Sequence, residues 1–143
     1  MKKIAMRIMC AVLAAAVALA LTGCGGKTPA YKDGEYTGVS QTDDDGTYGE
    51  ATITVEGGKI SRCEFVTWQK DGTIKDAEYG KVNGEVSNQE FYDKAQLAVR
   101  AMAQYADQLV EVQKPSDVDA VSGATVSYGQ FRDAVNNALK SAT

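Results

Sequence analysis

The protein has 143 residues, of which 44% are hydrophobic and 24% are charged, and its formal net charge is −4. This length is enough for one well-buried domain and too short for two. The chain has no histidine, which excludes Ser-His-Asp and Cys-His catalysis, histidine zinc sites and histidine-ligated haem.

The N-terminal segment has the pattern of an export signal. Three basic residues among the first seven are followed by the charge-free run 8–21. That run is shorter than the roughly 20 apolar residues that a membrane-spanning helix needs, so a spanning anchor is not expected.

The apolar run ends in Leu-Thr-Gly-Cys, residues 21–24, which resembles the lipobox of bacterial lipoproteins. The resemblance implies that residues 1–23 are removed and that Cys24 is acylated on sulfur, which anchors the protein on the extracytoplasmic face of the cell membrane. The alternative is an ordinary cleaved signal followed by a chance cysteine. Residues 24–32 would then be a short lipidated tether, and residues 33–143 the folded domain.

Removal of the signal changes both the charge and the cysteine content. It leaves 12 basic and 19 acidic residues, a net charge of about −7, which argues against nucleic-acid binding. Cys10 leaves with the signal and Cys24 is the lipidation site. Cys63 therefore has no partner for an internal disulfide, and we expect it to pack as a small core residue.

The first part of the domain has the pattern of antiparallel strands. Residues 34–40 and 48–56 flank a polar tip, and apolar Ala51, Ile53 and Val55 alternate with polar residues. Gly57-Gly58 predicts a tight hairpin turn into a third strand over 59–69, with a bulge near Ser61-Arg62.

Three consecutive aspartates, residues 43–45, lie in the polar tip between the first two strands. They lack the alternating ligands and the distant glutamate of a calcium loop. A solvated hairpin tip is therefore favoured over a cation site.

Two helices are predicted in the second half of the chain. Ser87 or Asn88 can cap a helix that runs to about residue 110, after an unassigned loop between turn signals at 71–72 and 83–84. Its expected apolar face consists of Phe91, Ala95, Ala98, Val99, Met102, Ala106 and Leu109. Pro115 ends this helical region.

The last helix has its apolar stripe at Phe131, Ala134, Val135, Ala138 and Leu139. Ser127 and Gln130 have the spacing of a capping box, so residues 122–127 are expected to precede its N-terminus. The predicted fold is α+β: one domain in which a small antiparallel sheet packs against two main helices.

The stretch DAVSGATVS, residues 119–127, places small and hydroxyl residues just before that helix. A helix N-terminus presents unpaired N–H groups and a partial positive charge, and Gly123 and Ala124 leave room for an anion such as phosphate to approach. The same residues also fit a plain helix cap, so the residues alone leave both interpretations open.

Asp119-Ala120-Val121-Ser122-Gly123-Ala124-Thr125 resembles, position for position, the flavinylation motif of the FMN-binding domain family. The start GEYTG and the hairpin GGKI are also similar, and the resemblance covers roughly residues 33–140. It implies that a separate flavin transferase moves FMN from FAD onto the hydroxyl of Thr125. Asp119, Ser122, Gly123 and Ala124 are then part of the motif that the transferase recognises.

Three aromatic residues outside the two helical stripes are candidates for contact with the isoalloxazine ring: Trp68, Tyr79 and Tyr128. Ordinary packing in the core or at the surface is the alternative for each of them.

The resemblance implies a membrane-anchored electron-transfer flavoprotein that carries covalent FMN. Its expected electron donor is a quinone-linked membrane dehydrogenase or another flavoprotein. A surface lipoprotein that binds a ligand or partner without a redox role is the alternative. A self-contained reductase is disfavoured because about 120 residues remain after cleavage, too few for a second catalytic module.

Overall fold

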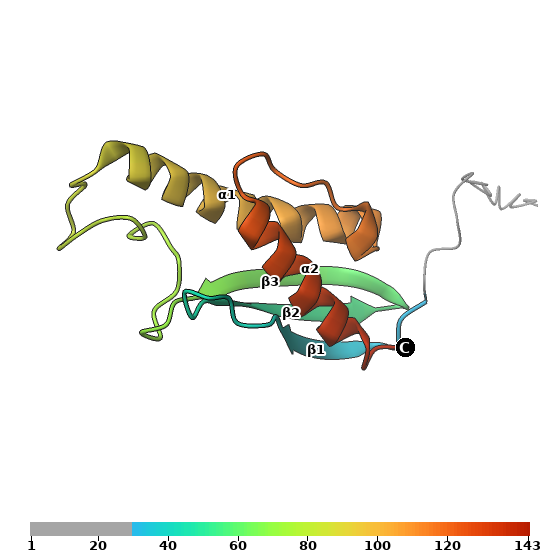
Figure 1. Ribbon diagram of the computed structural model, residues 1–143. Helices are drawn as coiled ribbons and strands as arrows, with labels where there is room; N and C mark the ends of the chain where they lie inside the picture. Colours follow the sequence, from blue (N-terminus) through green and yellow to red (C-terminus); the bar gives the residue numbers. More distant parts are fainter. Residues whose placement is uncertain (1–29) are drawn as a thin grey trace, which may run out of the picture.

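One antiparallel sheet and two helices make up residues 30–143, the part of the chain that the computed structural model describes (Figure 1). The predicted signal, Cys24 and most of the predicted tether lie outside these residues. The elements, in chain order, are β1 (Gly34–Val39), β2 (Tyr48–Glu56), β3 (Lys59–Trp68), α1 (Gln89–Val112), the 3-10 turn η1 (Pro115–Asp117) and α2 (Thr125–Leu139).

The sheet has the simple strand order β1-β2-β3, and both pairings are antiparallel. The predicted alternation in β2 is confirmed, because Ala51, Ile53 and Val55 are at most 1% exposed. Gly57 and Gly58 have φ angles of +59° and +77°, as a tight turn between right-twisted strands requires. The register shifts beside Thr54 and leaves Ser61 as the extra residue, which confirms the expected bulge.

Both helices lie on the same face of the sheet, α2 over β1 and β2 and α1 over β3. The core between the layers contains aromatic rings in edge and tilted contacts: Phe131 lies 5.2 Å from Phe65 and 5.5 Å from Tyr105, measured between ring centroids. The α+β fold with an antiparallel sheet and two helices is therefore confirmed.

Helix α2 lies directly on the backbone of β1. A Cβ atom at Gly38 would lie 2.2 Å from the carbonyl oxygen of Ala134 and 2.2 Å from the amide nitrogen of Ala138. Only glycine permits this approach. The sheet thereby fixes the position of α2 closely.

Helix α1 begins as predicted, because the Asn88 side chain accepts a hydrogen bond from the amide of Phe91 at 3.0 Å. The predicted apolar face is confirmed in part. Its buried members are Ala95, Met102, Ala106 and Leu109, whereas Ala98 and Val99 are half-buried. Phe91 is 51% exposed, which contradicts its assignment to the core. The first turns of α1, which include Phe91, project past the end of the sheet (Figure 1). Phe91 is accordingly not part of the core cluster.

The predicted capping box of the last helix is wrong. Helix α2 begins at Thr125, and its N-cap position, Ala124, has no side chain that bonds the first turn. Ser127 and Gln130 lie inside the helix and are buried. The Gln130 amide instead donates to the side chains of Thr47 at 3.0 Å and Asp43 at 3.1 Å, so a tertiary contact with the β1–β2 turn replaces the local one.

The β1–β2 turn is organised by one of its three aspartates. The Asp43 carboxylate accepts hydrogen bonds from the amides of Asp45 and Thr47. Burial raises the pKa of Asp43, but these bonds, that of the Thr47 hydroxyl and the charge of Lys75 outweigh it and lower the pKa overall. The residue therefore serves the turn that the sequence predicted.

Cys63 is half-buried against the core, as expected. Burial, together with the charges of Glu64 and Asp107, raises its pKa to about 12, so the residue stays a neutral thiol.

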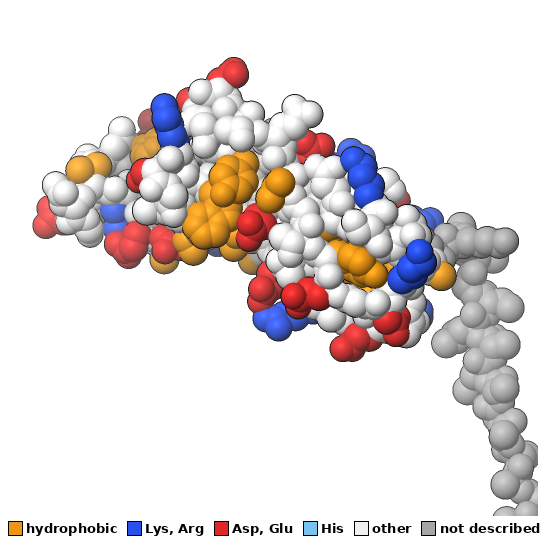
Figure 2. Space-filling view, turned by 90° about the horizontal axis from the view of Figure 1, so that it is seen from below, with side chains coloured by type: hydrophobic (Ala, Val, Ile, Leu, Met, Phe, Trp, Pro, Cys, Tyr) orange, Lys and Arg blue, Asp and Glu red, His pale blue; other side chains and the backbone are white. Residues whose placement is uncertain are grey.

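Figure 2 shows the molecule from below, the side turned away from α1. Its hydrophobic side chains form small groups separated by polar atoms and by clusters of Asp and Glu. None of the helices within residues 30–143 is both long and apolar enough to span a membrane.

Candidate functional site

Thr125 is the first residue of α2 and its side chain is exposed. The segment before it runs back along α1, where the Tyr105 hydroxyl accepts from the Val121 amide at 3.0 Å and donates to the Ala124 carbonyl at 3.3 Å. Because Tyr105 is completely buried, these two bonds fasten the segment to the core. The hydroxyl of Thr125 is thus held at a fixed place on the surface.

Gly123 and Ala124 shape the approach to Thr125 in different ways. Gly123 has a φ of +86°, and a Cβ atom there would lie 2.9 Å from Cδ2 of Leu97. The positive φ is the reason for glycine here, and a Cβ atom would also require the end of the Leu97 side chain to shift. Ala124 is 3% exposed, so its methyl group packs into the core, and a larger side chain there has no room.

The start of α2 forms one wall of a pocket of about 450 Å³. Its other walls come from the β1–β2 turn, the loop after β3 and the first half of α1. The lining side chains outside α2 and its preceding turn are Asp43, Asp45, Lys75, Tyr79, Phe91, Lys94, Ala95 and Ala98. A second hollow of about 560 Å³ adjoins it and shares Asp45, Lys75, Tyr79 and Phe91.

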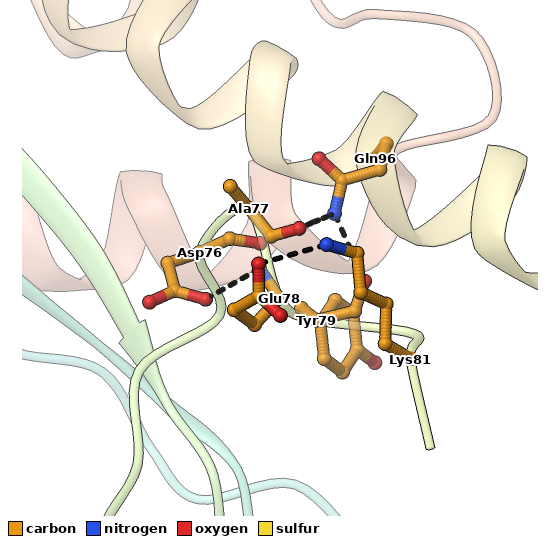
Figure 3. Close-up of polar contacts among 6 residues, drawn as sticks. All are labelled: Asp76, Ala77, Glu78, Tyr79, Lys81 and Gln96. Atoms are coloured by element: carbon orange, nitrogen blue, oxygen red, sulfur yellow. Dashed lines mark hydrogen bonds and ion pairs between the residues drawn. The ribbon is translucent and has the colours of Figure 1, made fainter. Parts of the chain in front are cut away.

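The loop between β3 and α1 reaches the pocket because a single side chain ties it to the helix (Figure 3). The Gln96 amide nitrogen lies 3.2 Å from the Asp76 carbonyl, 3.4 Å from that of Ala77 and 2.9 Å from that of Tyr79. The ring of Tyr79 lies 6.4 Å from that of Phe91 in an edge arrangement. This side of the pocket is therefore aromatic.

Two lysines, Lys75 and Lys94, line the pocket, and Lys70 and Lys81 line the hollows beside it. Lys94 pairs with Glu90 at 2.7 Å, and Lys81 pairs with Glu78 at 2.8 Å. The Lys75 ammonium lies 5.1 Å from the centroid of the Tyr79 ring, and within residues 30–143 it forms no ion pair. Burial lowers the pKa of Lys75, and the charges of Asp43 and Asp45 partly oppose that shift.

The structure places the other predicted site residues at varying distances from this pocket. Asp119 and Ser122 are exposed on the segment before Thr125, where another protein can reach them. Of the three predicted aromatics, only Tyr79 lines the pocket.

Tyr128 and Trp68 have surroundings of their own. The Tyr128 hydroxyl donates to the Val118 carbonyl at 2.7 Å, and its ring packs on Tyr105. Trp68 lines a hollow of about 660 Å³ under the same loop, formed in part by Tyr79 and Gly80. Its buried indole N–H has no hydrogen-bond partner among the described residues.

Residues 30–140 match the FMN-binding domain family. The chain belongs to this family. The crystal structure of the CPE2226 protein from Clostridium perfringens is similar, with 26% identity and a TM-score of 0.62 over 78% of this chain and 88% of that one.

A solution structure from Clostridium thermocellum covers 77% of this chain and 91% of its own, with 27% identity and a TM-score of 0.46. No curated protein matches the chain.

The pocket of this FMN-binding domain fits FMN in size and in the chemistry of its walls. Volumes of about 300–1,000 Å³ are usual for small-molecule sites. The first turn of α2 has amide donors without a side-chain cap, which suits a phosphate. Tyr79 and Phe91 offer aromatic surface for a flat ring system. When bound, the flavin supplies one- and two-electron chemistry.

Sequence reasoning did not name Lys75, Phe91 and Lys94 as residues of a binding site, although all three line this pocket. They come from a loop and a helix far from the motif in sequence, and neither lysine belongs to a recognisable pattern. Phe91 did carry one signal, because the hydrophobic stripe of α1 begins before the part of the helix that the sheet can cover.

Proposed function

We propose that this FMN-binding protein is an extracytoplasmic, membrane-anchored electron carrier whose FMN is linked by a phosphoester to Thr125. The observation that carries the proposal is the exposed Thr125 hydroxyl at the uncapped start of α2, on the wall of a partly aromatic pocket. Helix amides at this position stabilise the negative charge that a phosphodiester keeps.

The attachment is a balanced transfer from FAD. The bond between the FMN phosphorus of FAD and the bridging oxygen breaks, and AMP leaves with that oxygen. The oxygen of Thr125 forms the new bond to the FMN phosphorus and gives up its proton. The pocket of about 450 Å³ then receives the flavin. A separate flavin transferase performs this step, with Asp119 and Ser122 exposed for recognition.

In the proposed carrier role, electrons reach the flavin from a partner. The described residues form a single sheet with two helices, and the pocket of about 450 Å³ is the one that Thr125 lines. The proposed donor is a quinone-linked membrane dehydrogenase or another flavoprotein. Covalent attachment suits a location outside the cytoplasm, because FMN lost by dissociation there is not recovered.

The test is to produce the full chain with an active flavin transferase, denature it, and look for flavin fluorescence that stays with the polypeptide. Thr125→Val keeps the β-branched shape but removes the acceptor oxygen, so the fluorescence should disappear. Ser122→Ala should weaken labelling less, because Ser122 does not form the bond. A wild-type intact mass without an FMN adduct, with the transferase shown to be active, would overturn the proposal.

The proposed anchor has its own test. Cys24→Ala removes the thiol that acylation needs, so the protein should leave the detergent phase while it keeps its fold and its flavin. Unchanged partitioning of this variant would rule out the lipid anchor. The flavin proposal does not depend on that result.

A further inference from the structure

Lys75 is the one lysine of the pocket whose charge is not balanced by an ion pair within the described chain. Its backbone amide donates to the Thr67 carbonyl at 2.9 Å, which fixes the loop at the end of β3. Its side chain is half-buried, and its ammonium lies 5.1 Å from the Tyr79 ring centroid. The Lys75 ammonium is therefore held at the wall of the pocket.

The position of the flavin ring follows from its tether, so this inference rests on the proposed attachment at Thr125. The phosphate is fixed at the start of α2. Tyr79, Phe91 and Lys75 line the remainder of the pocket, and these residues would hold the ribityl chain and the ring. The aromatic residues offer a surface to the ring, and Lys75 offers a charge to its polar edge.

Reduction changes the charge at that edge. A flavin that takes two electrons from a donor protein and one proton from water becomes an anion, with its negative charge around N1 and the C2 carbonyl. A fixed cation nearby stabilises the reduced form more than the neutral oxidised form, and the effect is strong where water is partly excluded. The cofactor then accepts electrons at a higher potential.

We propose that Lys75 sets the potential of the flavin by pairing with the negative charge of its reduced isoalloxazine. The charged groups that face Lys75 are Asp43 and Asp45 from the β1–β2 turn. Lys94 of α1 lines the same pocket but is paired with Glu90. The two aspartates limit the effect of Lys75 without forming an ion pair with it.

The experiment measures the midpoint potential of the flavinylated full chain by spectroelectrochemistry. Lys75→Gln should lower the potential, by about 30 mV for each tenfold loss in the preference for the reduced flavin. Lys75→Arg keeps the charge and should stay close to wild type. Lys81→Gln is the matched control, because it removes a lysine of the same loop that is already paired with Glu78 and does not line this pocket, and its potential should change little.

The outcomes separate this inference from the proposed function. Equal potentials for Lys75→Gln and wild type would overturn it, as would equal shifts for Lys75→Gln and Lys81→Gln. If Lys75→Gln takes up no flavin while wild type does, Lys75 serves attachment, and the inference also fails. A wild-type chain without flavin would instead refute the attachment at Thr125.

Discussion

The two helices of this protein begin in opposite ways. Helix α1 starts with Asn88, whose side chain bonds the amide of Phe91 at 3.0 Å. Helix α2 starts with Ala124, which has no side-chain group to offer, and the donors of its first turn face the pocket. An N-terminus of the first kind has one of its free amides satisfied by its own cap, whereas the amides of the second kind are left for water or a ligand.

The starts of the two helices also differ in how closely the rest of the protein holds them. The start of α1 projects past the sheet and leaves Phe91 half in solvent. Helix α2 is pressed against the backbone at Gly38 and held at its start through Tyr105. The helix start without a side-chain cap is thus the one that the core holds firmly, and this arrangement keeps Thr125 in place for the proposed attachment.

The largest effect is expected from breaking the support of α2. Gly38→Ala places a methyl group against helix backbone that cannot move aside, so it should destabilise the fold by about 3 kcal/mol. Gly129→Ala, at an exposed position of α2 with open space around it, should instead stabilise it slightly. Denaturant unfolding of both variants measures the contrast, and equal midpoints would show that the close approach is absent.

The turn before Thr125 should be the next most sensitive place. Gly123→Ala meets both a φ of +86° and a contact of 2.9 Å with Leu97, whereas Gly72→Ala meets only a φ of +84° with nothing nearby. The backbone penalty alone is about 1–2 kcal/mol. Thermal unfolding should therefore show a larger loss for Gly123→Ala, and the excess measures the packing against Leu97.

The cap of α1 supplies a smaller and more local effect. Asn88→Ala removes the bond to Phe91 and should cost about 1 kcal/mol. It should leave flavin labelling unchanged, because the start of α2 does not depend on it. Ser87→Ala is the neighbouring control, and a destabilisation equal to that of Asn88→Ala would show that the cap had been assigned to the wrong residue.

The smallest effect should appear in acid. The pKa of Asp43 is lowered in the folded protein, so its ionised form stabilises the fold above the unfolded-state pKa of about 3.9. That contribution is lost as the pH falls through the lowered value. Asp43→Asn should flatten the dependence of the melting temperature on pH below about 4. An unchanged slope would mean that the carboxylate charge does not hold the turn.

The sequence predicted the parts of the fold that local patterns determine. The alternation in β2, the Gly57-Gly58 turn and the Asn88 cap each depend on neighbours within a few residues. The motif at 119–125 likewise led to the family that residues 30–140 match. These features were readable because the residues that make them are close in sequence.

The errors arose where distant segments decide. Gln130 has the spacing of a capping box but lies beside Thr47 and Asp43, which no local pattern reveals. Phe91 continues the stripe of α1 beyond the edge of the sheet. Lys75 comes from a loop that Gln96 holds in place through backbone carbonyls, and such bonds leave no trace in composition.

The two ends of the described domain meet at the far end of α2 from the pocket. The Lys32 amide donates to the Ala142 carbonyl at 2.7 Å, and the Lys32 ammonium bonds the Thr143 carbonyl at 2.9 Å. Helix α2, with 15 residues, separates this junction from Thr125 by about 22 Å. A fluorescent label or a fused protein at residue 143 is therefore expected to leave the cofactor accessible, which makes this end the natural handle for surface immobilisation and voltammetry.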